Sequence, residues 1–239
     1  MIESNIKPVK DFSVTEFQAL NHRIYGTTND RYFETWRIIA RMQMFVGRML
    51  TALRTDEATL DRLLYYLPMA NSWLMALANR VHLTSDNPNH PNFEELIWTR
   101  FPGVCRYCQG RPCLGPEVCK REMILDTHTP PYIKPRTLRE FQKMFAEIYP
   151  QNQLEALKSH MAEEAFEVME AFEHFCGKDD DELFEELCGE AIDVFTFIIG
   201  VCNYFKIDLA SEMEVQFAKG CPKCSLLVCN CKHWAAKLK

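Results

Sequence analysis

The chain has 239 residues and a formal net charge of −6, with 47% hydrophobic residues and only nine glycines. This acidic balance gives no electrostatic footprint for nucleic acid, so no nucleic-acid partner is expected. The longest apolar stretch, residues 194–205, is too short to span a bilayer, and residues 1–12 contain no apolar signal region. We therefore expect a soluble, cytoplasmic, all-α protein without membrane contact.

The first half of the chain predicts four helical segments followed by a cysteine-rich motif. Apolar periodicity favours helices at residues 13–26, 33–53, 60–83 and 93–101. Pro68 is expected to start or kink the third of these helices. The Pro-rich stretch that follows reads as a linker, and the predicted division of the chain is residues 1–113, linker 114–136 and residues 137–239.

The second half repeats this order. Helices are expected at about 137–148, 153–175, 180–205 and 208–219. Glu-Phe-Gln, followed after five intervening residues by Ile-Tyr, occurs near the start of both halves, and Cys-x2-Cys-x4-Cys occurs near the end of both. The identical order favours an internal duplication over coincidence. The predicted fold is therefore two related helical bundles in tandem, packed as a pseudo-dimer, each ending in a Cys-rich metal knuckle.

Two carboxylates, Glu190 and Asp193, open a run that has no further charge before Lys206. A helix that is apolar nearly all round lies centrally in its bundle, and buried carboxylates need a partner or a metal. Acids on the preceding helix, within 163–170, would alone be read as a solvated face, but they can meet this pair if the two helices are antiparallel. Oxygen ligands at that density suit Mg²⁺ or Mn²⁺.

The motif EEAFE (163–167) followed by EAID (190–193) resembles the Glu-Glu-x-x-Glu … Glu-x-x-Asp signature of the MazG-like nucleotide pyrophosphohydrolases. The resemblance covers roughly residues 137–220. It implies Mg²⁺-dependent hydrolysis of a nucleoside triphosphate, or its deoxy form, to the monophosphate and pyrophosphate. The implied Mg²⁺ ligands are Glu164, Glu167, Glu190 and Asp193, with Glu163 adjoining them as a fifth catalytic candidate.

Substrate contacts are predicted less sharply. Lys158, Lys219 and Arg139 are candidates for phosphate contacts and Asn203 for ligand contact, while surface or capping roles stay open for all four. Where the second half has its acids, the first half has none, so it is expected to be a degenerate copy that has lost the metal site. Six of its residues are candidates for contacting base or phosphate, although packing or solvation is the simpler reading of any one of them: Trp36, Arg37, Arg41, Arg48, Asn71 and Trp73. Because family members are commonly oligomers, a homodimer is left open.

Eight of the eleven cysteines fall into two groups. Four thiolates make a closed tetrahedral site suited to structural Zn²⁺, and an iron–sulfur cluster is the alternative. The fourth ligand of the first group is expected to be Cys119 or absent, and Cys176, Cys188 and Cys202 are expected to be buried apolar residues. The two predicted ligand sets are Cys105, Cys108, Cys113 and Cys119, and Cys221, Cys224, Cys229 and Cys231.

Two functions compete at this point. The first is the Mg²⁺-dependent pyrophosphohydrolase, with a nucleotide substrate, an active second half and a supporting first half. The second is a non-catalytic helical module with zinc knuckles that senses nucleotides or binds a partner.

Overall fold

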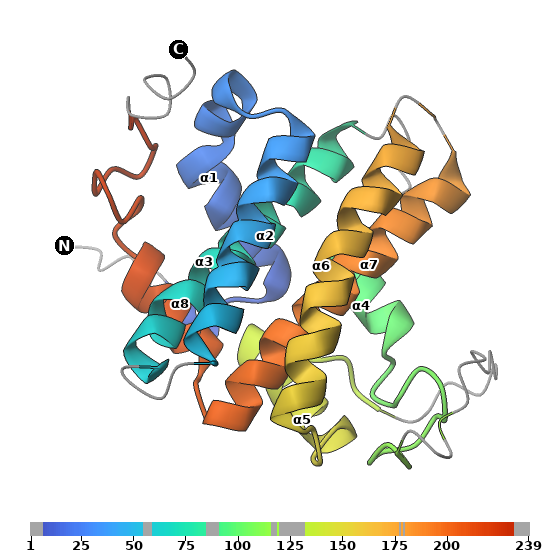
Figure 1. Cartoon of the computed structure of the whole chain (residues 1–239). Helices are drawn as coiled ribbons and strands as arrows, with labels where there is room; N and C mark the ends of the chain where they lie inside the picture. The colour runs from blue at the N-terminus through green and yellow to red at the C-terminus, as the bar shows by residue number, and fades with distance from the viewer. Residues whose placement is uncertain are drawn as a thin grey trace.

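A computed structural model describes residues 7–54, 59–84, 91–115, 119, 132–176, 178 and 180–231. Within these residues the protein is all-helical, with no strand, as the sequence predicts (Figure 1). A short 3₁₀ helix, η1 (Val9–Asp11), precedes eight α-helices. These are α1 (Val14–Tyr32), α2 (Thr35–Ala52), α3 (Thr59–Thr84), α4 (Phe93–Arg100), α5 (Leu138–Ile148), α6 (Leu154–Phe175), α7 (Asp181–Phe205) and α8 (Leu209–Phe217).

Side-chain caps fix where several helices begin. Ser13 Oγ accepts a hydrogen bond from the backbone N–H of Glu16, and Glu16 Oε2 accepts one from the N–H of Ser13, which is a complete capping box. The hydroxyl of Thr137 accepts a hydrogen bond from the N–H of Glu140 at the start of α5, and Asp180 caps α7. Pro68 lies inside α3 rather than at its start.

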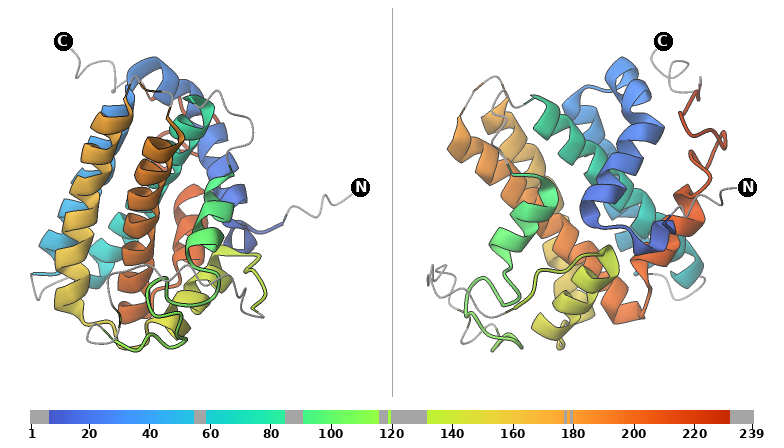
Figure 2. Two further views of the ribbon diagram at one scale, coloured as in Figure 1. Left: turned by 90° about the vertical axis from the view of Figure 1, so that its right-hand side faces the viewer. Right: turned by 180° about the vertical axis from the view of Figure 1, so that it is seen from behind.

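Two helical hairpins form the centre of the protein. Helix α2 packs along α3 and α6 along α7, while α2 also contacts α6 and α3 contacts α7 (Figure 1). Helices α6 and α7 run side by side in the left view of Figure 2. One hydrophobic core extends through both halves, from Val14 to Cys231.

The last helix of each half packs against a central helix of the other half. Helix α4 packs against α7, and α8 packs against α3. The cysteine-rich segments also contact the other half. The N–H of Cys113 donates to the carbonyl of Ile148, and the N–H of Cys229 donates to the carbonyl of Ile24, each at 2.7 Å. Each cysteine-rich segment is therefore attached to the first helix of the other half.

Helix α7 is central in this arrangement. It is long and apolar enough to cross a membrane by length and composition, but 72% of the relevant window is buried within the protein. Burial on this scale is typical of the core helix of a bundle.

Most of the predicted linker lies outside the described residues. Of residues 114–136 the structure describes 114, 115, 119 and 132–136. The division of the chain into 1–113, 114–136 and 137–239 stays a prediction.

Candidate metal-binding sites

The contact between α6 and α7 brings three acidic side chains together. One carboxylate oxygen from each of Glu164, Glu190 and Asp193 lies within 4.8 Å of the other two. Asp193 is only 5% exposed, and Glu164 and Glu190 are partly buried. These three residues are called the carboxylate cluster below.

The other two predicted acids are Glu167 and Glu163, and they differ in how close they lie to this cluster. Glu167 is close enough for its charge and a hydrogen bond to raise the pKa of Glu164. Glu163 is mostly exposed, and its Oε2 lies 3.2 Å from Nδ1 of His160. The structure therefore places Glu167 beside the cluster and Glu163 outside it.

Two arginines reach the cluster from the first half of the chain. Arg100, the last residue of α4, donates from Nη2 to Oδ2 of Asp193 at 2.6 Å. Arg106, in the first cysteine-rich segment, donates from Nη1 to Oδ1 at 3.0 Å and to Oδ2 at 2.8 Å. These partners lie 93 and 87 residues from Asp193 in sequence, and no local sequence signal identifies them.

Gly189 makes room for one of these arginines. A Cβ atom at this position would lie 2.9 Å from Nη1 of Arg100, which is closer than such contacts allow. The absence of a side chain in the middle of α7 thus permits the guanidinium to pass the helix and reach Asp193.

The electrostatics of the cluster favour protonation in the absence of a cation. Burial, followed by the charges of Asp193, Glu167 and Glu190, raises the pKa of Glu164 to about 9. Burial and the charge of Asp193 raise the pKa of Glu190 to about 7. Burial raises the pKa of Asp193 to about 7 against the opposing charge of Arg106, and the hydrogen bond from Arg100 further favours the ionised form.

The charges in the cluster suit one divalent cation. Four ionised carboxylates, counting Glu167, and two guanidiniums leave a formal charge of −2. Asp193 Oδ1 accepts one hydrogen bond and Oδ2 accepts two, so Oδ1 keeps a lone pair for a further partner. The donor set consists of hard oxygen atoms, which is the chemistry that Mg²⁺ and Mn²⁺ prefer.

The four weaker substrate candidates are engaged or exposed. Arg139 donates from Nε and Nη2 to Oδ2 of Asp208, at 2.9 and 2.6 Å. Lys158 Nζ donates to Oε1 of Glu155 at 2.6 Å. Asn203 Nδ2 donates to the carbonyl of Gln142 at 3.1 Å, which joins α7 to α5. Lys219 is exposed just after α8. The described contacts therefore do not bring these side chains to the carboxylate cluster.

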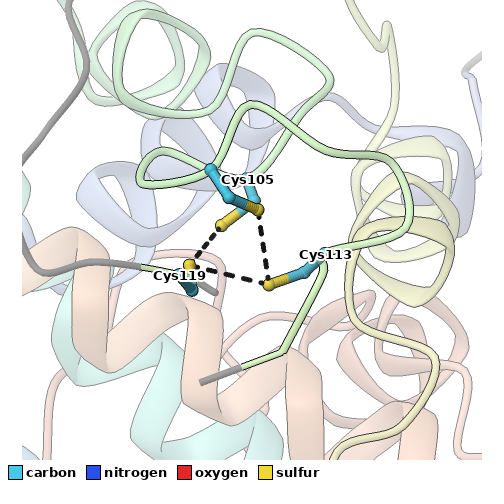
Figure 3. Close-up of side chains that lie close together, drawn as sticks. Cys105, Cys113 and Cys119 are labelled. Atoms are coloured by element: carbon cyan, nitrogen blue, oxygen red, sulfur yellow. Dashed lines mark hydrogen bonds between the residues drawn. The ribbon is translucent and has the colours of Figure 1, made fainter. Parts of the chain in front are cut away.

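The cysteines form two four-residue clusters. In each of them the four Sγ atoms lie within 4.8 Å of one another, and the members are Cys105, Cys108, Cys113 and Cys119 in the first and Cys221, Cys224, Cys229 and Cys231 in the second. Cys119 thus joins the first cluster, and Figure 3 shows its sulfur converging with those of Cys105 and Cys113. All eleven cysteines of the chain are described, and none forms a disulfide.

The sulfur spacing fits one shared ion. The Sγ atoms of Cys105 and Cys119 are 3.4 Å apart, and those of Cys113 and Cys119, like those of Cys221 and Cys231, are 3.8 Å apart. In a tetrahedron with Zn–S bonds of about 2.3 Å, neighbouring sulfurs are about 3.8 Å apart. A multi-iron cluster places thiolates on different metal atoms, which separates them further. Both clusters could therefore bind a single metal ion such as zinc.

Backbone amides assist the thiolate form in both clusters. Burial opposes ionisation of Cys108, but N–H groups of Leu114 and Gly110 outweigh it and lower the pKa of the thiol to about 7. The N–H of Asn230 is the main cause that lowers the pKa of Cys224 to about 7. N–H donors directed at sulfur stabilise the charge that a metal ligand must carry.

The remaining cysteines follow the sequence expectation only in part. Cys188 and Cys202 are buried, as predicted. Cys176 is exposed, so its predicted burial is wrong. It is the C-cap residue of α6, at the exposed end of the helix.

Comparison of the chain with protein-family models, curated proteins and solved structures finds no match. We therefore infer the chemistry of the sites from their own side chains alone.

Proposed function

We propose that the protein is a Mg²⁺-dependent nucleoside triphosphate pyrophosphohydrolase, which converts a nucleoside triphosphate and water to the monophosphate and pyrophosphate. The observation that carries the proposal is the meeting of Glu164, Glu190 and Asp193 on two adjacent helices. These residues belong to the two motifs that resemble the MazG-like signature, and α6 and α7 are the helices on which such a signature has to converge.

We also propose that the chain is a tandem of two related bundles. The reciprocal hydrogen bonds of the cysteine segments support it, because each joins a cysteine at the same place in its motif to an isoleucine at the same place in its helix. The reciprocal packing of α4 on α7 and of α8 on α3 is the second support. A duplicated subunit whose last helices are exchanged would produce both.

The residues around the cluster have distinct roles in this proposal. Glu164, Glu167, Glu190 and Asp193 would hold Mg²⁺, which supplies charge neutralisation for the phosphates and acidifies a bound water. Arg106 and Arg100 would favour the ionised form of Asp193 against its burial and would orient it. A carboxylate of the cluster would accept the proton of the attacking water.

The two cysteine clusters are proposed to hold structural Zn²⁺. Four thiolates around one ion leave no open position for a substrate, so catalysis at these sites is not expected. The first cluster lies in the segment that carries Arg106, so its metal would also fix one wall of the carboxylate cluster.

The deciding experiment is pyrophosphate release from a panel of ribo- and deoxyribonucleoside triphosphates with and without Mg²⁺. We expect Mg²⁺-dependent release that falls by at least 100-fold in Glu164→Gln and Glu190→Gln. Glu185→Gln is the matched control, because Glu185 lies on the same helix α7 and is exposed. The absence of release from every nucleotide tested would reject the enzymatic proposal.

One observation favours the non-catalytic alternative. Two arginines on a buried carboxylate form a network that can be purely structural. In that case the protein would be a helical module that binds a nucleotide or a partner without turnover, and the Glu164 and Glu190 variants would not differ from Glu185→Gln in any nucleotide assay.

A further inference from the structure

A cavity of about 550 Å³ lies in the first half of the chain, outside the carboxylate cluster. Helices α1, α2 and α3 form most of its wall, and residues of α8 and the second cysteine cluster close one side. Its volume falls within the range of about 300–1,000 Å³ that is usual for small-molecule sites.

The lining combines aromatic and basic side chains. The basic ones are Arg41 and Arg48 on α2 and Lys223 in the second cysteine cluster, and no Asp or Glu is among the described lining residues. This is unusual in a chain whose net charge is −6. The aromatic lining residues are Tyr25, Phe33, Phe45, Tyr65 and Trp73.

The cavity occupies the place in the first half that the carboxylate cluster occupies in the second. A shift of 119 positions superposes the buried residues of α6 on buried residues of α2: Leu157 on Ile38, Met161 on Met42, Ala165 on Val46, Val168 on Met49 and Ala171 on Ala52. In this register Phe45 stands for Glu164 and Arg48 stands for Glu167, and both line the cavity. The charge on this wall has thus changed from acidic to basic.

The buried positions of α7 can be matched with those of α3 in the same way. A shift of 121 positions superposes buried Phe184, Ala191, Phe195 and Ile198 on buried Leu63, Ala70, Leu74 and Leu77. Ser72 then stands for Asp193, and it too lines the cavity. A site with this wall cannot hold a cation through carboxylates, but it can attract an anion.

A buried acceptor in the wall lacks a donor among the described residues. Asn21 is 5% exposed, and its Nδ2 donates to the carbonyl and the hydroxyl oxygen of Ser72, both at 2.8 Å. Since a carbonyl can only accept, the amide nitrogen must face it, which leaves Asn21 Oδ1 as the atom without a hydrogen-bond partner. This oxygen has less than 1 Å² of accessible surface, so it is enclosed within the wall and is not open to the cavity.

We propose that this cavity binds a nucleoside phosphate as a second ligand, separate from any substrate of the carboxylate cluster. The base lies among the aromatic side chains. Arg41 and Arg48 bind the phosphates. Cys221 and Cys231 would be negative thiolates with Zn²⁺ bound, so the phosphates belong on the α2 side of the cavity, away from them.

The test is isothermal titration of the zinc-loaded protein with ATP, GTP and CTP in buffer without Mg²⁺, where hydrolysis at the carboxylate cluster is not supported. We expect saturable one-to-one binding of at least one nucleotide. Inorganic triphosphate, which lacks the ring, and the free nucleoside, which lacks the phosphates, should each bind at least tenfold more weakly.

Variants locate the binding. Arg48→Gln and Arg41→Gln should each weaken it by at least tenfold, and Arg48 is exposed, so its replacement does not threaten the core. Arg37→Gln is the matched control, because Arg37 lies on the same helix, stacks on Trp36 and does not line the cavity. Glu164→Gln should leave this binding unchanged.

Three results would overturn the proposal: no binding of any of the nucleotides, equal binding by Arg48→Gln and the wild type, or loss of binding in Glu164→Gln. Because the titration needs no turnover, its failure is distinct from failure of the pyrophosphohydrolase proposal.

Discussion

Arg106 holds both carboxylate oxygens of Asp193, with Nη1 at 3.0 Å from Oδ1 and 2.8 Å from Oδ2. One residue lies in a cysteine-rich segment of the first half and the other in the central helix of the second half. The stability of α7 and the position of the first cysteine cluster are therefore linked through one buried ion pair.

The first prediction concerns Asp193→Asn. From the sequence alone, removal of this charge relieves repulsion among acids and is expected to raise the stability of the metal-free protein. The two arginines reverse that expectation, because the change leaves two partly buried guanidiniums without a counter-charge. Breaking such a pair costs about 3–5 kcal/mol. Thermal or urea unfolding measures this loss of stability. The control Glu185→Gln should leave the unfolding free energy within about 0.5 kcal/mol of wild type.

Gly189→Ala tests the close approach of Arg100 to α7. At a solvent-exposed position within a helix, a Gly→Ala change stabilises the folded state by about 1 kcal/mol through helix propensity. Here the new methyl group would lie 2.9 Å from Nη1 of Arg100, so we expect a net loss of stability and a weaker contact with Asp193.

Gly47→Ala is the control for that change. Gly47 lies within α2 and is exposed. Apart from the adjoining residues and the backbone of its own helix, a methyl group added there would have no atom within 4 Å. The propensity gain should therefore appear there in full. Equal shifts in melting temperature for the two variants would contradict the role assigned to Gly189.

The carboxylate cluster predicts a pH dependence of stability. The pKa values of Glu164 and Glu190 are raised in the folded protein to about 9 and about 7, so between about pH 4.5 and pH 9 the folded chain binds more protons than the unfolded chain. Stability in buffer without Mg²⁺ should therefore fall as the pH rises through this window.

Glu164→Gln should flatten that profile, since it removes the group with the larger shift. Added Mg²⁺ should stabilise the wild type mainly at the alkaline end, where its ligands are ionised. Melting temperatures across pH 5–9, with and without Mg²⁺, provide the measurement. A wild-type profile that rises with pH in the absence of Mg²⁺ would show that the acids are not clustered as described.

Zinc content gives a further prediction. The purified chain should carry two tightly bound Zn²⁺ ions by elemental analysis, and Cys224→Ala should carry one and lose stability, because such binding energy contributes to folding. Cys176→Ala is the control, since this thiol is exposed and lies in neither cluster. Native protein with neither zinc nor iron, and with all eight clustered thiols freely titratable, would rule out both metal sites.

The helices were predictable because their signals are local. The boundaries of α5, α6 and α7 fall within a residue of the predicted ones, since Thr137 and Asp180 cap helices whose apolar periodicity is unbroken. The convergence of Glu164 with Glu190 and Asp193 followed from helical spacing once the two helices were paired.

The rest depended on contacts between distant segments. Arg100 and Arg106 carry no signal in their own neighbourhood, and only the packing of α4 on α7 brings them to Asp193. The cavity was indicated only in part, because Arg41, Arg48 and Trp73 were candidates for contacting base or phosphate while packing or solvation was the simpler reading of each. Only the packing of α1, α2 and α3 brings them to one cavity. Spacing around Cys119 left its membership open, because the proximity of sulfur atoms is set by how the loop folds back.

The exchange of the cysteine segments also constrains how the chain can fold during synthesis. The carbonyl of Ile24 leaves the ribosome 205 residues (229 − 24) ahead of the N–H of Cys229 that it binds. Part of the final surface of helix α1 therefore stays uncovered until residue 229 has emerged. Contacts of such sequence separation form slowly and leave apolar surface exposed in the meantime. A ribosome-bound chain in which only the residues before 221 have emerged should consequently bind chaperones more strongly than one in which residue 231 has also emerged.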